Sequence, residues 1–430
     1  MNRFLCGTNH RWAGAVGAVL ALLLSAVTLS VAHPAAAASV LAPIDTGGFK
    51  MRAGDFTNRG AAIQQIEASG SVSVRTSPDQ ILADGGHAGR AALCHNTNLD
   101  GSLQYDGFCW DQADDTSAVW TPQGLTGSHD AQPSGTWNGH YLYIASWHYT
   151  DNDYARITIA ESTGTSVTYQ HVLLVDPYST GDGSTFRPVG GAGDRSGADV
   201  LSGHADGVTW YGNKLFVATG HQIQVYDLRH LWKMSDTSTD QVGVLGNGKS
   251  SARYHNWALP MVGVYFTGNT GDPCDATRPC LTSLSLDRTS SPDALVTSQI
   301  ATQGGGPLIR WPLNASTALP DTDTANDYTG TVTATGAYTV PIWKVQGAAT
   351  DGTYYYFSGE CPETAGTTDS DVPYCIHRAL PGAAPHVLTH APPLTQNLSY
   401  APSSGRLWGL NERQNTTTGK RVVFSLVPSA

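Results

Sequence analysis

The sequence predicts an all-β fold assembled from copies of one strand–turn–strand module. The clearest copy starts at His204-x-Asp206, continues through the strand around Val208, turns at Gly212 and enters a second strand at 215–217. Alternating bulky apolar and β-branched residues favour strands, and the Gly-Asn pair favours a tight turn. Because such copies recur at intervals of tens of residues, the pattern is typical of a β-propeller. A seven-bladed ring is favoured, with five or six blades as the alternatives.

Three further copies support the repeat. Each begins with a polar residue and reaches an aromatic-rich strand after a glycine turn, and the polar residues are His129, Gln346 and Asn397. If the copies are equivalent, these side chains and His204 mark the start of the innermost strand in four blades. We therefore expect them to converge on the central hollow as a site. The alternative is that they line a wet channel and satisfy neighbouring backbone groups.

The first 38 residues predict a cleaved secretory signal peptide. Arg3 and Arg11 flank the start, residues 13–31 are nearly all apolar, and alanines 35–38 offer cleavage sites. An uncleaved signal anchor is the alternative. No later stretch has the roughly 20 apolar residues of a membrane span. Residues 39–430 contain no proline- or serine-rich linker, so we expect one propeller domain there.

The charge of the chain argues against nucleic acid as a partner. Removing the leader takes away two arginines and no acid, which leaves 22 basic and 35 acidic residues and a net charge of −13. No basic stripe remains to bind phosphates. We expect a secreted, extracellular monomer with no membrane contact after signal cleavage.

The cysteines also favour export. Cys6 lies in the leader, and the other six fall into three local couples, Cys94 with Cys109, Cys274 with Cys280, and Cys361 with Cys375. Six cysteines permit fifteen pairings. Local couples in an exported chain favour disulfides across loops or blade edges. A zinc site is the weaker alternative, because the chain has no C-x-x-C motif.

Further strands are expected between the copies. Residues 156–159 and 169–175 would complete the blade that contains His129, whereas 257–266 and 281–286 are expected to belong to another blade, with the second cysteine couple. Residues 228–234 suggest one helical turn. The last strand, 421–427, could join a blade begun by the N-terminal part and so close the ring.

Two pairs of imidazole and carboxylate could carry chemistry, His129-Asp130 and His204-x-Asp206. Either pair could bind a transition metal, since both groups are zinc ligands. Either could instead perform acid–base catalysis, with the carboxylate orienting an imidazole whose pKa lies near neutrality. Neither spacing is a specific motif, and the chain has no G-x-S-x-G or H-E-x-x-H.

A second group of candidates mixes aromatic rings with basic side chains. Trp147, Arg156, Arg253 and His255 lie in segments of this composition. Rings that stack on sugars, beside an arginine that binds a carboxylate, would recognise an acidic glycan. Core packing is the alternative for the tryptophan.

Three phrases of the sequence carry a family resemblance: 120–124 (WTPQG), 169–175 (YQHVLLV) and 204–212 (HADGVTWYG). They resemble a family of secreted bacterial and fungal propellers over residues 120–232. More distantly, the chain is similar to seven-bladed propeller polysaccharide lyases, including the rhamnose–glucuronate lyase type. The resemblance implies the fold more than the activity, because none of that family's catalytic residues can be matched position by position.

The leading hypothesis is β-elimination on an extracellular, uronate-containing polysaccharide or oligosaccharide. His129 or His204 would remove the C5 proton, and Arg156 or Arg253 would stabilise the enolate. Substrate contacts are expected from Asp130, Asp206, Trp147, His255, Gln346 and Asn397.

Three alternatives remain. A glycoside hydrolase would use a carboxylate pair such as Asp130 and Asp206. A non-catalytic propeller would bind a glycan or a protein without turnover. A calcium-dependent lactonase is the third. The leading hypothesis requires no cofactor, and a divalent cation such as calcium is kept as an alternative.

Overall fold

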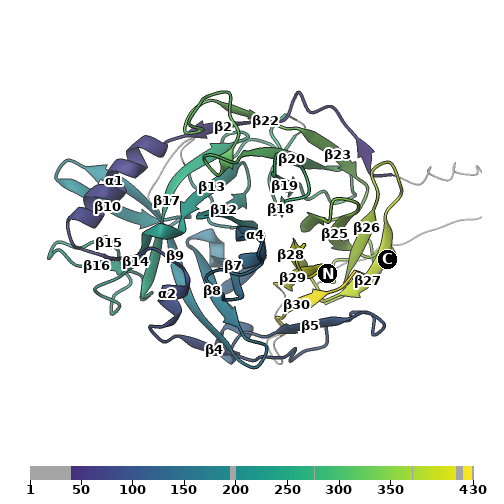
Figure 1. Cartoon of the computed structure of the whole chain (residues 1–430), viewed down its shortest axis with the longest axis horizontal. Helices are drawn as coiled ribbons and strands as arrows, with labels where there is room; N and C mark the ends of the chain where they lie inside the picture. Colours follow the sequence, from purple (N-terminus) through teal and green to yellow (C-terminus); the bar gives the residue numbers. More distant parts are fainter. Residues whose placement is uncertain (1–39, 194–199, 276, 370, 413–419, 429–430) are drawn as a thin grey trace, which may run out of the picture. The chain divides into compact units, whose positions relative to one another are not determined.

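The computed structural model describes residues 40–193, 200–275, 277–369, 371–412 and 420–428 (Figure 1). The expected signal peptide at 1–38 lies outside these residues. None of the described helices has the length and apolar character needed to cross a membrane.

Twenty of the described strands form five antiparallel units of four strands each. We call them the first to fifth blades. Their strands, taken outward from the innermost, are β6 (Trp120–Gly127), β7 (Leu142–Tyr149), β8 (Ala155–Ser162) and β9 (Val167–Thr180); β11 (Gly207–Tyr211), β12 (Lys214–Thr219), β13 (Gln222–Asp227) and β17 (Trp257–Phe266); β18 (Ser285–Asp287), β19 (Ala294–Ser298), β20 (Gly306–Asn314) and β23 (Gly336–Val340); β24 (Gly347–Thr350), β25 (Tyr355–Glu360), β26 (Tyr374–Ala379) and β27 (His386–Ala391); and β28 (Thr395–Ala401), β29 (Arg406–Asn411), β30 (Val423–Leu426) and β5 (Tyr105–Phe108).

The innermost strands make a closed ring, so the all-β propeller prediction is confirmed. Strand β6 contacts β11, β11 contacts β18, β18 contacts β24, β24 contacts β28, and β28 contacts β6 again. The described residues thus make five blades, which is one of the alternatives to the favoured seven. Residues 257–266 form the outermost strand of the second blade, β17, whereas residues 281–286 lead into β18 of the third blade, so the two segments do not share a blade as expected.

The ring closes through the pairing expected for the last strand. Strand β30 pairs with β5, which comes from the N-terminal part of the chain and completes the fifth blade. Because the fifth blade contains strands from both ends of the fold, backbone hydrogen bonds tie the N-terminal part of the chain to its last strand.

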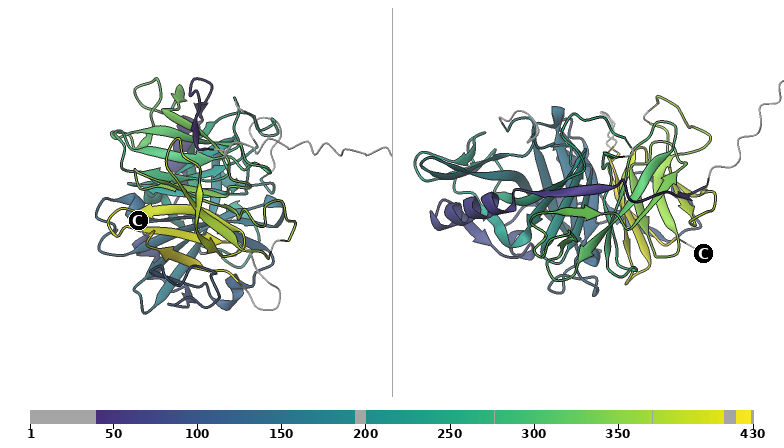
Figure 2. Two further views of the ribbon diagram at one scale, coloured as in Figure 1. Left: turned by 90° about the vertical axis from the view of Figure 1, so that its right-hand side faces the viewer. Right: turned by 90° about the horizontal axis from the view of Figure 1, so that it is seen from above.

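Residues 40–119, which we call the N-terminal belt, run along the outer edges of the blades (Figures 1 and 2). Strand β1 pairs with β23, β2 with β17, β4 with β9, and β5 with β30. The other described belt elements are α1 (Phe56–Ala68), β3 (Ser73–Arg75), α2 (Asp79–Leu82) and α3 (Gln112–Asp115); β1 is Ala42–Pro43, β2 Lys50–Gly54 and β4 His87–Gly89. The remaining elements are α4 (Ser128–Ala131), β10 (Gly183–Pro188), β14 (Leu231–Lys233), β15 (Val242–Val244), β16 (Ser250–Ala252), β21 (Leu319–Pro320), β22 (Thr331–Thr333) and two 3₁₀ turns (Thr150–Asn152 and Leu228–His230).

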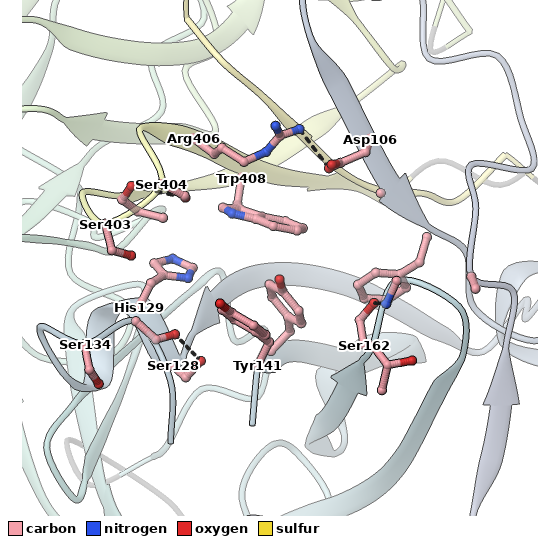
Figure 3. A pocket seen from close by; sticks show the side chains of 18 residues that line it. Asp106, Ser128, His129, Ser134, Tyr141, Ser162, Ser403, Ser404, Arg406 and Trp408 are labelled. Carbon is pink, nitrogen blue, oxygen red and sulfur yellow. Dashed lines mark hydrogen bonds and ion pairs between the residues drawn. The ribbon is translucent and has the colours of Figure 1, made fainter. Parts of the chain in front are cut away.

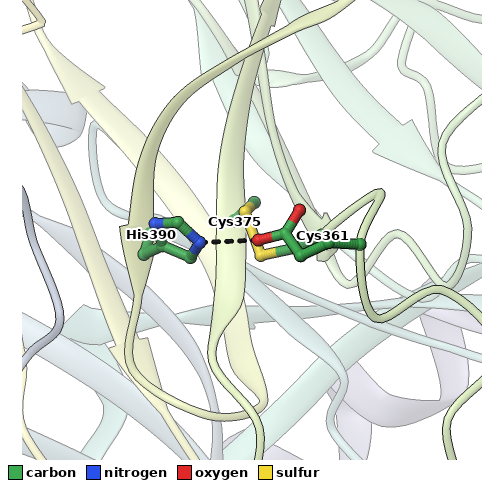
Figure 4. A group of neighbouring side chains, drawn as sticks. Cys361, Cys375 and His390 are labelled. Carbon is green, nitrogen blue, oxygen red and sulfur yellow. Dashed lines mark hydrogen bonds and ion pairs between the residues drawn. A yellow bond between two sulfur atoms is a disulfide. The ribbon is translucent and has the colours of Figure 1, made fainter.

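All three expected disulfides are present. They join Cys94 to Cys109, Cys274 to Cys280, and Cys361 to Cys375. The first lies in the belt, and the third ties the loop after β25 to β26 (Figure 4). Each closes a short loop, as the local cysteine spacing predicts.

Glycines allow the innermost strands to approach one another closely. A Cβ atom on Gly124 would lie 2.7 Å from the backbone nitrogen of Val208 in the next blade. A Cβ on Gly207 would collide with the backbone nitrogen of Leu284, again in the next blade. Only glycine fits at such contacts, because atoms on neighbouring strands already fill the space of a side chain.

We expect Gly207→Ala to destabilise the fold by about 1–3 kcal/mol, because the added methyl group must push β11 away from Leu284. The matched control is Gly246→Ala, since a Cβ there meets no atom within 4 Å and the backbone has no positive φ. Urea denaturation midpoints check the difference. Equal midpoints for the two variants would contradict the close packing of the ring.

Candidate functional site

The side chain of Asn397 fills the centre of the ring. This side chain is fully buried on β28. Its Nδ2 donates to the carbonyl oxygens of Leu125 (3.1 Å) and Leu284 (2.8 Å), and its Oδ1 accepts from the Leu284 nitrogen at 2.9 Å. Asn397 therefore bonds the backbones of the first and third blades, which is the backbone-satisfying alternative stated for these polar residues.

The expectation that His129 and His204 face one hollow is wrong. His204 precedes β11 and stacks on His148, with ring centroids 4.4 Å apart, and His148 pairs with Thr121 at the start of β6. His129 lies on α4, directly after the far end of β6. Innermost strands of a propeller run in the same direction, so the two imidazoles lie at opposite ends of the ring.

The misplacement of His129 has a local cause. The sequence pattern predicts that the innermost strand starts at His129, which would place this strand in the segment that contains Trp137. That segment is a loop in which Trp137 forms an isolated bridge with His140, and the innermost strand is β6, which precedes His129. His129 therefore follows the innermost strand of its blade, whereas His204 precedes the innermost strand of the next blade. The two positions are not equivalent.

His204 is poorly suited to act as a general base. Its Nδ1 lies 2.9 Å from Asp206 Oδ1, and this carboxylate raises the pKa of His204 to about 9. The imidazole is then protonated at neutral pH. Burial lowers the pKa of the neighbouring His148 to about 4, so that ring stays neutral.

The two candidate arginines do not lie beside either histidine pair. Arg156 is buried between the rings of Trp120 (4.3 Å) and Trp147 (5.0 Å), and its Nη2 donates to Asp114 Oδ1 at 2.8 Å. Trp147 is fully buried, in agreement with the core-packing alternative for this residue. Arg156 therefore has its charge balanced inside the protein and has no open face for a substrate carboxylate.

The other predicted site residues are also held by contacts within the protein or lie elsewhere. Arg253 lies over the rings of Tyr149 (4.5 Å) and Tyr154 (4.3 Å). His255 donates from Nδ1 to backbone oxygens, and burial lowers its pKa to about 3. Gln346 is half-buried just before β24. The structure thus does not bring the predicted catalytic residues together into one site.

A pocket of about 610 Å³ lies instead at the His129 end of the ring, between the first and fifth blades (Figure 3). Figure 3 shows Trp408 and Arg406 on one side of it and His129, Ser128 and Tyr141 across from them. Most of the polar and aromatic lining residues carry a hydroxyl group or a ring: Ser128, His129, Ser134, Tyr141, Tyr143, Ser162, Thr163, Ser403, Ser404 and Trp408, beside Arg406 and Asp106.

Aromatic surface faces this pocket. Trp408 is half-buried on β29 and packs on Tyr143, with ring centroids 4.5 Å apart. Tyr141 is 59% exposed. His129 lies nearly parallel to Trp408, at 6.5 Å between centroids. The pocket therefore offers flat apolar rings surrounded by hydroxyl groups.

A hydrogen-bond network holds His129 in the pocket wall. Ser399 Oγ donates to Asp130 Oδ2 at 2.7 Å, and Thr126 Oγ1 donates to the same oxygen at 2.6 Å. Ser399 has then used its only proton, so the 2.7 Å bond between His129 Nε2 and Ser399 Oγ requires the imidazole to donate. Burial lowers the pKa of His129, which keeps the ring neutral. Ser399 is thus not activated as a nucleophile.

The pocket lacks a pair of carboxylates for glycoside hydrolysis. Of the described residues that line it, Asp106 alone carries a carboxylate, and Arg406 Nη2 lies 2.8 Å from Asp106 Oδ1. The expected pair, Asp130 and Asp206, is divided between the two ends of the ring, so that hypothesis is wrong for these residues.

Sequence reasoning missed the aromatic residues of this pocket. Trp408 and Tyr141 lie in aromatic-rich stretches of two copies, but those copies are 267 positions apart in the chain. They become neighbours only because the fifth blade closes against the first. A correct blade count would have been needed to pair them.

A second cavity, of about 600 Å³, lies beside α1 and is less suited to a ligand. Its wall contains Arg59 and Arg187, which both bond Asp176, at 2.7 and 3.2 Å. A third arginine, Arg52, lies over Phe266. The arginines of this cavity are therefore already paired with other side chains of the protein.

Cysteine-containing groups of potential metal ligands are excluded by the disulfides. Cys361 and Cys375 lie near His390 and Glu363, but their sulfurs are bonded to each other, and His390 Nε2 lies 2.7 Å from Glu363 Oε1 (Figure 4). A disulfide offers no thiolate to a metal ion.

The fold defines the class as a β-propeller, and the comparisons with known proteins add no family. No protein-family model and no curated protein matches the chain. Among solved structures, it is similar to a gluconolactonase from Xanthomonas campestris, with 10% identity over 80% of this chain and 97% of that one and a TM-score of 0.31.

Two further similar structures belong to other functional classes. One is the PQQ-bound aldose sugar dehydrogenase of Streptomyces coelicolor, with 9% identity, coverage of 76% and 99%, and a TM-score of 0.25. The other is the Neurospora crassa Pan2 WD40 domain, with 10% identity, coverage of 73% and 97%, and a TM-score of 0.25. The fold assignment rests on this chain's own sheet topology.

Proposed function

We propose that this chain is an extracellular, non-catalytic propeller that binds a saccharide in the pocket between its first and fifth blades. The observation that carries the proposal is the aromatic and hydroxyl-lined pocket around Trp408 and Tyr141. Sugar rings present apolar faces that stack on aromatic side chains, and their hydroxyl groups exchange hydrogen bonds with serine and arginine. Three disulfides support an oxidising, extracellular compartment.

The charge of the pocket favours a neutral saccharide over a uronate. Arg406 is already paired with Asp106, and its Nε donates to Ser425 Oγ at 2.7 Å. A uronate carboxylate would have to compete with Asp106 for this guanidinium. The acidic glycan expected from the sequence therefore loses its support.

The support for β-elimination is also lost. That reaction needs a base and a carboxylate stabiliser at one sugar unit. His129 is the one candidate of the four predicted catalytic residues that lines the pocket, and Arg156 is enclosed with Asp114 elsewhere. Binding without turnover is the alternative that fits this arrangement.

We expect Trp408→Ala to weaken saccharide binding about tenfold, because losing one stacking ring removes roughly 1.4 kcal/mol. Screening the purified chain against neutral and uronate-containing oligosaccharides identifies the ligand, and calorimetry measures its affinity. Trp343→Ala is the matched control, since Trp343 is also half-buried but lies in a different cavity.

Three outcomes would contradict the proposal. They are no binding to any saccharide, equal affinities of the two variants, and cleavage of the bound saccharide by the purified protein. Release of products that absorb in the ultraviolet would instead restore β-elimination.

A further inference from the structure

Metal-ligating atoms meet where the N-terminal belt contacts the first blade, away from the saccharide pocket. His87 begins β4, Asp114 lies on α3, and His171 lies on β9. Their nearest nitrogen and oxygen atoms all lie within 4.8 Å of one another. His171 Nε2 is 2.9 Å from Asp114 Oδ2, and His87 Nδ1 is 3.8 Å from the same oxygen.

A fourth ligand atom lies beside His87. Asp111 Oδ2 is 2.7 Å from His87 Nδ1. In a tetrahedral zinc site with bonds of about 2.0–2.1 Å, the ligand atoms are about 3.3 Å apart. The observed separations of 2.7, 2.9 and 3.8 Å lie on both sides of that value. Each of these three separations is within 1 Å of the tetrahedral value.

In three of the four ligand side chains, the nitrogen or oxygen atom that would not face the ion is hydrogen-bonded within the protein. Asp114 Oδ1 accepts from Arg156 Nη2 at 2.8 Å, Asp111 Oδ1 accepts from the Asp114 nitrogen at 2.9 Å, and His171 Nδ1 bonds Thr158 Oγ1 at 2.8 Å. Such outer contacts orient metal ligands and leave one atom of each directed at the ion.

Tyr169 orients His87, the fourth ligand, and stays outside the coordination shell. The His87 ring stacks on the Tyr169 ring, at 4.9 Å and 12°. The Tyr169 hydroxyl donates to Asp114 Oδ2 at 2.7 Å. A carboxylate oxygen can accept this bond and still bind a cation, because it has two lone pairs.

We propose that His87, Asp111, Asp114 and His171 form a binding site for a divalent transition-metal ion of the zinc type. Two imidazoles and two carboxylates suit zinc, whereas calcium prefers oxygen ligands alone. The side chains of His87 and Asp111 are 39% and 25% exposed, so an ion can enter from solvent.

The bound ion would fasten the belt to the first blade. Three of the ligands belong to the belt and His171 belongs to β9, so the ion joins segments that lie 57 or more positions apart. The Cys94–Cys109 disulfide already ties together the part of the belt between β4 and α3. The inferred role of the ion is structural.

The test is zinc titration of the untagged, chelator-treated chain by calorimetry, with Zn²⁺ alone as the probe. We expect one ion per chain and a higher melting temperature in zinc. His87→Asn keeps a donor at the Nδ1 position for the bond to Asp111 but removes a ligand. Its zinc affinity should fall at least ~100-fold, the upper range for losing even an outer contact.

His140→Asn is the matched control, because His140 Nδ1 also bonds a carboxylate, Glu161, at 2.6 Å on an exposed loop. This variant should bind zinc as the wild type does. If His87→Asn fails to fold, Asp111→Asn decides, since it keeps the Oδ1 bond of α3 and removes the charged ligand. Absence of stoichiometric zinc in the wild type, or unchanged affinity in the ligand variants, would overturn the site.

Discussion

Replacing Asn397 by alanine will lower the free energy of unfolding by about 4 kcal/mol or more. The amide of Asn397 is fully buried and bonds the nitrogen and oxygen of Leu284 together with the oxygen of Leu125. Alanine leaves these backbone groups without their partner at the centre of the ring. Each buried polar group left unsatisfied costs about 1–3 kcal/mol. Shifts in the urea denaturation midpoint measure the loss.

The control for this prediction is Asn247→Ala. Asn247 is exposed, and its Oδ1 accepts from the Lys249 nitrogen at 3.0 Å. Exposed substitutions of this kind change stability by about 0.5 kcal/mol or less. A small effect of Asn397→Ala, similar to that of the control, would show that the innermost strands do not depend on this side chain.

The second large effect is expected for Arg156→Met, at about 3–5 kcal/mol. Methionine can fill part of the space between Trp120 and Trp147, but it removes the charged donor from Oδ1 of the buried Asp114 carboxylate. Removing one partner of a buried ion pair destabilises strongly because the other charge stays behind in a poorly polar environment. Chemical denaturation checks this value.

Arg187→Met provides the comparison, because Arg187 also bonds a buried carboxylate. Its side chain is 32% exposed, and Asp176 keeps the bond from Arg59 Nε at 2.7 Å. We expect a loss of about 1 kcal/mol or less. Equal losses for the two arginine variants would contradict the view that Arg156 is enclosed as a structural cation.

Local pattern was sufficient to predict many of the individual strands. The copy at His204 predicted strands that appear as β11 and β12, and residues 156–159 and 169–175 lie within β8 and β9. Each of these strands has alternating or consecutive apolar residues and a glycine turn within a few positions. Such information is contained in neighbouring residues, so it can be recognised without knowledge of distant contacts.

The site required distant contacts that the pattern does not contain. The partner that neutralises Arg156 is Asp114, which lies 42 positions away on α3, outside the four sequence copies. Arginine among tryptophans looks the same in sequence whether it faces a ligand or a buried carboxylate. The pocket around Trp408 arises only at the junction of the first and fifth blades, and the location of that junction depends on the number of blades.

Hydroxyl-radical footprinting tests most directly whether a saccharide occupies the pocket between the first and fifth blades. The ligand found by screening should protect Trp408 and Tyr141 from oxidation and leave Tyr254, which is 58% exposed after β16, unchanged. Protection at Tyr254 with unchanged oxidation of Trp408 and Tyr141 would place the ligand elsewhere and contradict the proposed site.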